Sequence, residues 1–279
     1  MSETFKSLEM SGTVSIGVRE REGDKIQTRR EPVPARVRLR TVALPVEHGG
    51  WSFTLEPVAL GLLVAPSIAG LFLAFAAAGA FLARHPLKIV LGDRRRGRRF
   101  PRTAAAEVFL LLYGALTLAS ALGAAATAVS YAFLLPLLLA VPLVAVQLAF
   151  DAAGRSRSLA PELAGSAGLA AVSASIAMAD GWTFPASSVL WALLAGRAIP
   201  STLYVRARLR LLHGEKSPLL PVIVAHAVAF ALVSLLVWVN LAPTLAALAL
   251  FILLLRAVLG LLAQRHKVSA KRVGIAEVG

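Results

Sequence analysis

The sequence contains no cysteine, and this absence excludes disulfide bonds, thiolate catalysis and cysteine-ligated metal or iron–sulfur sites. Charged residues are also few: they make up 16% of the 279 residues, whereas hydrophobic residues make up 57%. A typical soluble domain has about a quarter charged residues and about 45–50% apolar ones. Because the apolar residues here occur in long runs, the composition predicts an integral membrane protein.

The apolar runs predict eight membrane-spanning helices, since a helix needs roughly 20 residues to cross the hydrocarbon layer. The division between Pro66 and Ser67 decides this number. One unbroken helix there would leave seven spans and would place the basic loops on opposite faces of the membrane. We therefore expect an all-α, polytopic helical bundle with these spans: 49–65, 67–83, 104–125, 129–150, 159–179, 187–205, 219–239 and 243–262.

Positive charge is confined to one set of connecting segments. Of the 29 Lys and Arg residues, 27 fall in the two tails and in the three connections that eight spans place on one side. In the connections on the other side, the only charged residue is Asp180. By the positive-inside rule, both termini are expected in the cytoplasm and the protein in the inner (plasma) membrane. This topology explains the net charge of +14, so the expected partner is the lipid bilayer and not nucleic acid.

The spans predict a domain organisation of two parallel four-helix halves between two tails. We expect a disordered, basic cytoplasmic tail over 1–44 and a transmembrane domain over 45–265, followed by a cytoplasmic tail over 266–279. The halves are 45–153 and 154–265. Each half carries its longest basic loop after its second helix, which makes the two halves a topological repeat.

Four ionisable residues lie inside apolar runs at one depth. Glu56, Arg197 and Arg256 each lie nine residues from a charged residue outside their span, namely Glu47, Arg206 and Arg265, and His226 lies eight residues past Pro218. These separations correspond to roughly 12–14 Å at 1.5 Å per residue. A charge near a helix centre costs roughly 2.5–3.5 kcal/mol, so such charges need a partner or a polar cavity. We predict a cavity open to the cytoplasm, with Glu56 paired to Arg197. A packing role for His226 and a snorkelling Arg256 remain alternatives.

Polar residues near the cytoplasmic ends of the spans complete a candidate site. If the protein is an enzyme, His48 and Glu56 are the candidate general acid or base. Arginine forks and hydroxyl donors suit a phosphate or diphosphate group. We expect no metal or cofactor. The predicted substrate-binding residues are Arg84, Lys88, Asp93, Gln147, Asp151, Arg197, Ser201, Tyr204 and Arg206.

Two segments resemble the YwiC-like family of bacterial membrane proteins. The first runs from Glu47 to Trp51 and contains a His-Gly-x-Trp pattern similar to that of the family. The second runs from Arg197 to Arg206 and includes Pro200. The resemblance extends over about residues 44 to 265, and it implies a bacterial membrane protein without implying a particular activity.

The expected architecture is similar, more distantly, to that of UbiA-type prenyltransferases, which are bundles of eight or nine spans in two four-helix halves. Their active site lies between the cytoplasmic loops after the second and sixth helices, which are the longest basic loops here. Those enzymes hold Mg²⁺ through Asp-rich motifs, whereas the two loops here offer only Asp93 and Glu215. The resemblance therefore implies a fold and a pocket location, and no catalytic residue is carried over.

Three functions follow from these patterns. The first is binding of an amphiphilic anion, such as a polyprenyl phosphate, a quinone precursor or a phospholipid, including conversion by a metal-independent or degenerate prenyltransferase-like enzyme. The second is secondary transport, because an acid–base pair beside proline-interrupted helices is typical of transporter sites. The third is a non-catalytic accessory or scaffold role in the membrane.

Overall fold

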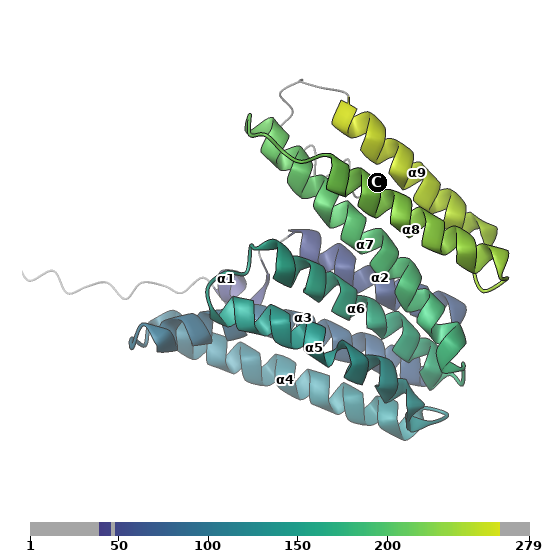
Figure 1. Ribbon diagram of the computed structural model, residues 1–279. Helices are drawn as coiled ribbons and strands as arrows, with labels where there is room; N and C mark the ends of the chain where they lie inside the picture. The colour runs from purple at the N-terminus through teal and green to yellow at the C-terminus, as the bar shows by residue number, and fades with distance from the viewer. Residues whose placement is uncertain (1–38, 46–47, 263–279) are drawn as a thin grey trace, which may run out of the picture. The chain divides into compact units, whose positions relative to one another are not determined.

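The computed structural model describes residues 39–45 and 48–262, and within those residues the chain is helical and contains no strand (Figure 1). The all-α prediction is confirmed. The helices are α1 (Leu39–Ala43), α2 (His48–Val64), α3 (Ile68–Arg95), α4 (Pro101–Thr127), the 3₁₀ helix η1 (Tyr131–Phe133), α5 (Leu134–Ala152), α6 (Leu159–Ala179), α7 (Phe184–Leu212), α8 (Leu220–Trp238) and α9 (Thr244–Leu262).

Seven of the described helices are long and apolar enough to cross a membrane, namely α3 to α9 with η1 joined to α5. The break between Pro66 and Ser67 is confirmed, because α2 ends at Val64 and the Ser67 hydroxyl caps α3 by accepting a hydrogen bond from the Gly70 N–H at 3.0 Å. The apolar part of α2 is shorter than that of the other seven helices. The chain is a multi-pass membrane protein, and an eighth span through α2 stays a prediction.

Part of the segment expected to be a disordered tail instead forms α1. Val42 of this helix is buried against Val90 of α3 and Ala106 of α4. The Tyr113 hydroxyl donates a hydrogen bond to the Ala43 carbonyl at 3.2 Å. The prediction for 1–44 was therefore wrong for residues 39–43, where a short apolar stretch finds a hydrophobic cluster to join. The rest of that tail, except Leu44, and residues 266–279 lie outside the described residues.

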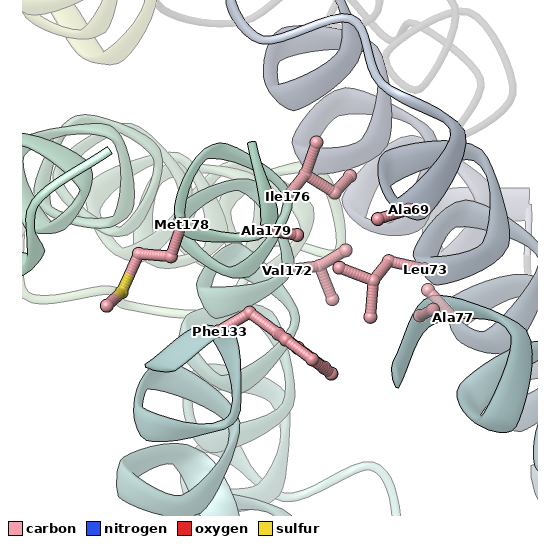
Figure 2. Packing of buried hydrophobic residues seen from close by; sticks show 9 residues of the cluster. Ala69, Leu73, Ala77, Phe133, Val172, Ile176, Met178 and Ala179 are labelled. Carbon is pink, nitrogen blue, oxygen red and sulfur yellow. The ribbon is translucent and has the colours of Figure 1, made fainter. Parts of the chain in front are cut away.

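Helix α6 is the centre of the packing. In its most apolar stretch of 18 residues, 78% of the residues are buried, whereas the corresponding share is at most 33% in any other described spanning helix. It packs against α2, α3, η1, α5 and α7. Small Ala, Gly and Ser side chains dominate its sequence, and such residues let membrane helices approach one another closely. Figure 2 shows Val172 and Ile176 of α6 beside Leu73 of α3 and Phe133 of η1.

Ile176 fits into a slot made by two glycines on neighbouring helices. A Cβ atom added at Gly61 of α2 or at Gly70 of α3 would lie 2.9 Å from the Ile176 side chain. No side chain larger than hydrogen fits at either position without a shift of Ile176, which is itself fully buried. The three helices are thereby held in register at one level of the bundle.

The helices alternate in direction, which gathers their connections at two ends (Figure 1). A hydrogen bond of 3.0 Å from the Val129 N–H to the Ala179 carbonyl joins the α4–α5 and α6–α7 connections at one end. The connections 96–100, 153–158 and 213–219 belong to the opposite end, together with Arg206, Arg208 and Arg210 in the last part of α7, and these segments are called the basic connections below. The predicted boundary between the halves falls between α5 and α6, which pack against each other. The division into two four-helix halves therefore describes the order of the helices along the chain, and as a division into domains it stays a prediction.

We predict that Ile176→Ala lowers the free energy of unfolding by about 2–5 kcal/mol, because it leaves a cavity between α2, α3 and α6. The matched control is Leu232→Ala on α8, where the native side chain is 58% exposed and the loss should be below about 1 kcal/mol. Unfolding in mixed micelles, followed by circular dichroism, measures both losses. Equal losses would contradict the central position of α6.

Candidate functional site

A cavity of about 640 Å³ lies between α2, α6, α7, α8 and α9. Helix α7 forms its longest wall, because Arg197, Ser201, Val205 and Leu209 recur every fourth residue and therefore share one helix face. The remaining walls come from the other four helices. Their polar contributions are Ser52, Glu56, Glu162, His226 and Arg256.

The predicted layer of ionisable residues does converge on this cavity. Glu56, Arg197, His226 and Arg256 come from four different helices, and all four line the same space. Glu56, His226 and Arg256 lie six to eight residues from the same end of their described helices, whereas Arg197 lies fifteen residues from the end of α7, which is the longest of these helices. The four residues therefore border one cavity, and a functional role for them stays a prediction.

The predicted ion pair between Glu56 and Arg197 is confirmed. An Arg197 guanidinium nitrogen donates to a carboxylate oxygen of Glu56 at 2.5 Å, and the side chains keep 32% (Glu56) and 34% (Arg197) of their surface exposed. Each partner is next to or near a proline inside its helix, Pro57 in α2 and Pro200 in α7. Proline has no N–H, so the carbonyl four residues earlier loses its intrahelical donor. One of these carbonyls belongs to Phe53, which lines the cavity.

His226 combines the two roles that the sequence left open. It is 5% exposed, and its Nδ1 donates a hydrogen bond to the Val222 carbonyl at 2.8 Å. A carbonyl oxygen can only accept, so this bond assigns the ring proton to Nδ1 and leaves Nε2 as an acceptor in the neutral ring. The ring also meets Tyr204 edge-on, with centroids 6.3 Å apart. His226 is thus both a hydrogen-bonded packing residue and part of the cavity wall.

Tyr204 and Arg208 fix α7 against α9 at Gly260. A Cβ added at Gly260 would lie 2.1 Å from the Tyr204 hydroxyl oxygen, so only glycine allows this approach. The Arg208 guanidinium donates to the Gly260 carbonyl at 2.7 Å. Because Arg256 lies four residues before Gly260, this junction also places Arg256 at the cavity.

A second ion pair, which the sequence did not indicate, crosses the cavity between α6 and α7. The Arg206 guanidinium lies 2.7 Å from a Glu162 carboxylate oxygen and also donates to the Arg157 carbonyl at 3.0 Å. Glu162 escaped notice because it lies in the first turn of its helix, where an acidic residue is ordinary. Of the described residues, four arginines and two glutamates line the cavity, which gives these side chains a formal excess of two positive charges.

Several predicted substrate-binding residues lie away from this cavity. Asp151 of α5 is paired with Arg84 of α3 through contacts of 2.7 and 3.1 Å, and Lys88 lies 3.8 Å from the same carboxylate. The Asp151 side chain is only 1% exposed. Gln147 packs closely against Gly165 of α6. These residues link α3, α5 and α6, and a role for them in binding stays a prediction.

Asp93 belongs to a third cluster, at the connection between α3 and α4. Its carboxylate accepts hydrogen bonds from Arg102 and Thr103, each at 2.7 Å, and lies 3.7 Å from Arg96. This arrangement stabilises the connection and lies outside the cavity. His48 begins α2, but its side chain lies outside the described part of the structure. Among the described residues, no group of three or more His, Asp or Glu side chains has the arrangement of a metal site.

The family model described as YwiC-like protein matches residues 44–179. Over this stretch the chain is similar to that family. The match ends at Ala179, the last residue of α6, so it contains Glu56 and Glu162 but none of the four cavity arginines. The predicted resemblance is confirmed there, and its extension to the segment from Arg197 to Arg206 stays a prediction. Comparisons with curated proteins and with solved structures found no match, so the UbiA likeness also stays a prediction.

We predict that Glu56 and Arg197 are energetically coupled. Glu56→Gln and Arg197→Gln should each destabilise the protein, and the double variant should lose less than the sum, with a coupling energy of roughly 0.5–3 kcal/mol. The reason is that each single change leaves the partner's charge unpaired at membrane depth. A double-mutant cycle of unfolding free energies in mixed micelles measures the coupling, and strictly additive losses would contradict it.

Proposed function

We propose that this multi-pass membrane protein binds an amphiphilic anion in the cavity between α2, α6, α7, α8 and α9. The proposed ligands are a polyprenyl phosphate, a quinone precursor or a phospholipid. The observation that carries the proposal is the concentration of four arginines against two glutamates among the described residues that line one cavity. Its volume of about 640 Å³ lies within the range of roughly 300–1,000 Å³ that is typical of ligand pockets.

The cavity offers both kinds of surface that an amphiphile needs. Arg197 and Ser201 are one helical turn apart on α7, so a guanidinium fork and a hydroxyl face the same space. Arginine binds phosphate oxygens in pairs, and a hydroxyl adds a further donor. Phe53 and Leu253 line the same space with apolar surface, which suits a hydrocarbon tail. Of the two acid–base candidates, Glu56 lines the cavity, and a catalytic role for it remains part of the proposal.

The proposal includes an orientation with the basic connections in the cytoplasm. The three basic connections belong to one end of the bundle, and the connections at the other end carry only Asp180. Lys and Arg are retained on the cytoplasmic side when helices insert, so this asymmetry favours a cytoplasmic position for the basic end. The head group of the ligand would then enter from the cytoplasmic side.

A second candidate function is secondary transport, which one observation favours. The Glu56–Arg197 pair joins two proline-containing helices at the cavity, and interrupted helices with paired charges are typical of transporter sites. In proteoliposomes, transport predicts an ion or proton flux that depends on added anion. Binding without transport predicts saturable binding and no flux.

We predict that the protein purified in a mild neutral detergent retains a bound anionic amphiphile. Arg197→Ala should reduce the retained amount at least about tenfold, because a charged hydrogen bond contributes about 1.5–3 kcal/mol. The matched control is Arg94→Gln, which also removes one positive charge but lies at an exposed position on α3. Native mass spectrometry and lipid extraction measure the retained amount. Equal retention by both variants would contradict the proposed site.

We predict that the two ends of the bundle are labelled from opposite sides of the membrane. The absence of native cysteine allows single reporters without background. Asn240→Cys, at the α8–α9 connection, should react with an impermeant maleimide in intact cells. Arg95→Cys, at the end of α3, should react only after the cells are opened. The reverse pattern would place the cavity entrance on the outside.

A further inference from the structure

The proposed anion site already holds an anion that belongs to the chain. The Glu56 carboxylate lies 2.5 Å from the Arg197 guanidinium, and both side chains line the cavity. About a third of each side chain is exposed, so a group inside the cavity can reach the pair. Helix α2 packs mainly along α6 and only lightly against α7. The contact between Glu56 and Arg197 is therefore not enforced by a close-packed interface between their two helices.

We propose that Glu56 is the resident counter-ion of the anion site, and that the ligand's head group displaces it from Arg197. This inference rests on the proposed function. In the absence of ligand the carboxylate compensates the guanidinium at membrane depth, where an unpaired charge is costly. When an anion binds, the two negative groups compete for one cation. Glu56 thus lowers the affinity for the ligand, although it belongs to the site.

The displacement restricts the chemistry of the head group. A ligand carboxylate would only replace one carboxylate by another, with the same charge and the same oxygen pair, and it would gain nothing at Arg197. A phosphate monoester brings a second charge and a third terminal oxygen, which can accept hydrogen bonds from further donors. Ser201 and Arg256 line the same cavity, and a hydroxyl and a guanidinium are both hydrogen-bond donors. The structure therefore favours an alkyl or polyprenyl phosphate monoester over a fatty acid.

The second ion pair provides a matched control in the same cavity. Glu162 and Arg206 are 2.7 Å apart, and their exposure resembles that of Glu56 and Arg197. Arg206, however, is also held by the Arg157 carbonyl, and the pair lies about 13 Å away along α7 at 1.5 Å per residue. Glu162→Gln removes the same charge from the same cavity, but it leaves the anion site at Arg197 unchanged.

The test is the affinity for decyl phosphate, measured by isothermal titration calorimetry on the full chain in a neutral detergent. Arg197→Gln should weaken binding at least about tenfold, whereas Glu56→Gln should tighten it roughly tenfold, because it removes a like charge beside the ligand. Glu162→Gln should change the affinity by less than about threefold. Glu56→Asp, whose shorter side chain reaches Arg197 less well, should fall between wild type and Glu56→Gln.

The outcomes separate this inference from the function on which it rests. Weak binding by Arg197→Gln together with unchanged or weaker binding by Glu56→Gln would overturn the displacement and leave the proposed function standing. Unchanged binding by Arg197→Gln would overturn both. Tighter binding by Glu162→Gln as well as by Glu56→Gln, to the same degree, would replace a specific competitor by a general charge effect and would also overturn the inference.

A measurement on the wild-type protein decides the matter if the Glu56 variants do not fold. Decyl phosphate should bind at least about tenfold more tightly than decanoate, which has nearly the same tail and a single carboxylate. Decanol serves as the uncharged comparison for the tail alone. Equal affinities for decyl phosphate and decanoate would overturn the inference, because the need to displace Glu56 would then not favour a phosphate over a carboxylate.

Discussion

Close packing on α6 is the constraint on which the fold and the site both depend. Helices α2 and α7 contact this helix along their length but contact each other only lightly. Their relative position is therefore set by α6, whose small side chains let both approach closely. Ile176, seated between Gly61 and Gly70, fixes the level at which α2 meets α6. The pairing of Glu56 with Arg197 across the cavity is a consequence of this packing and not its cause.

The cost of charge in a bilayer explains why the polar residues form separate clusters. Asp151 with Arg84, Asp93 with Arg102, and Glu162 with Arg206 each neutralise one carboxylate with at least one cation. The first two pairs enclose carboxylates that are 1% exposed, and they connect helices. The pairs at the cavity keep about a third of each side chain exposed. Exposure to a shared space, more than charge alone, distinguishes a candidate binding site from a structural ion pair.

The sequence predicted where the helices lie in the chain and which residues lie inside them. It did not predict which neighbouring helix each side chain faces. Run lengths predicted the long helices, and residue spacing predicted that Glu56, Arg197 and His226 would meet in one space. Spacing does not say which neighbouring helix a side chain meets. Spacing therefore does not separate Lys88, which lies near Asp151, from the residues of the cavity, and it does not indicate that Glu162 meets Arg206. The small helix α1 was also missed, because five residues give too little periodicity against a charged background.

The charges of the cavity are divided between the stretch that the family model matches and the helices that follow it. Both cavity glutamates lie within residues 44–179, on α2 and α6, whereas all four cavity arginines lie on α7 and α9. Two ion pairs join these parts across the cavity. Among the described lining residues, the arginines outnumber the glutamates by two. Opposite charges on facing surfaces orient the two parts and disfavour other arrangements. The matched stretch alone would present carboxylates without the cations opposite them. An anion site of the kind proposed here therefore requires α7 and α9 as much as the family-matched helices.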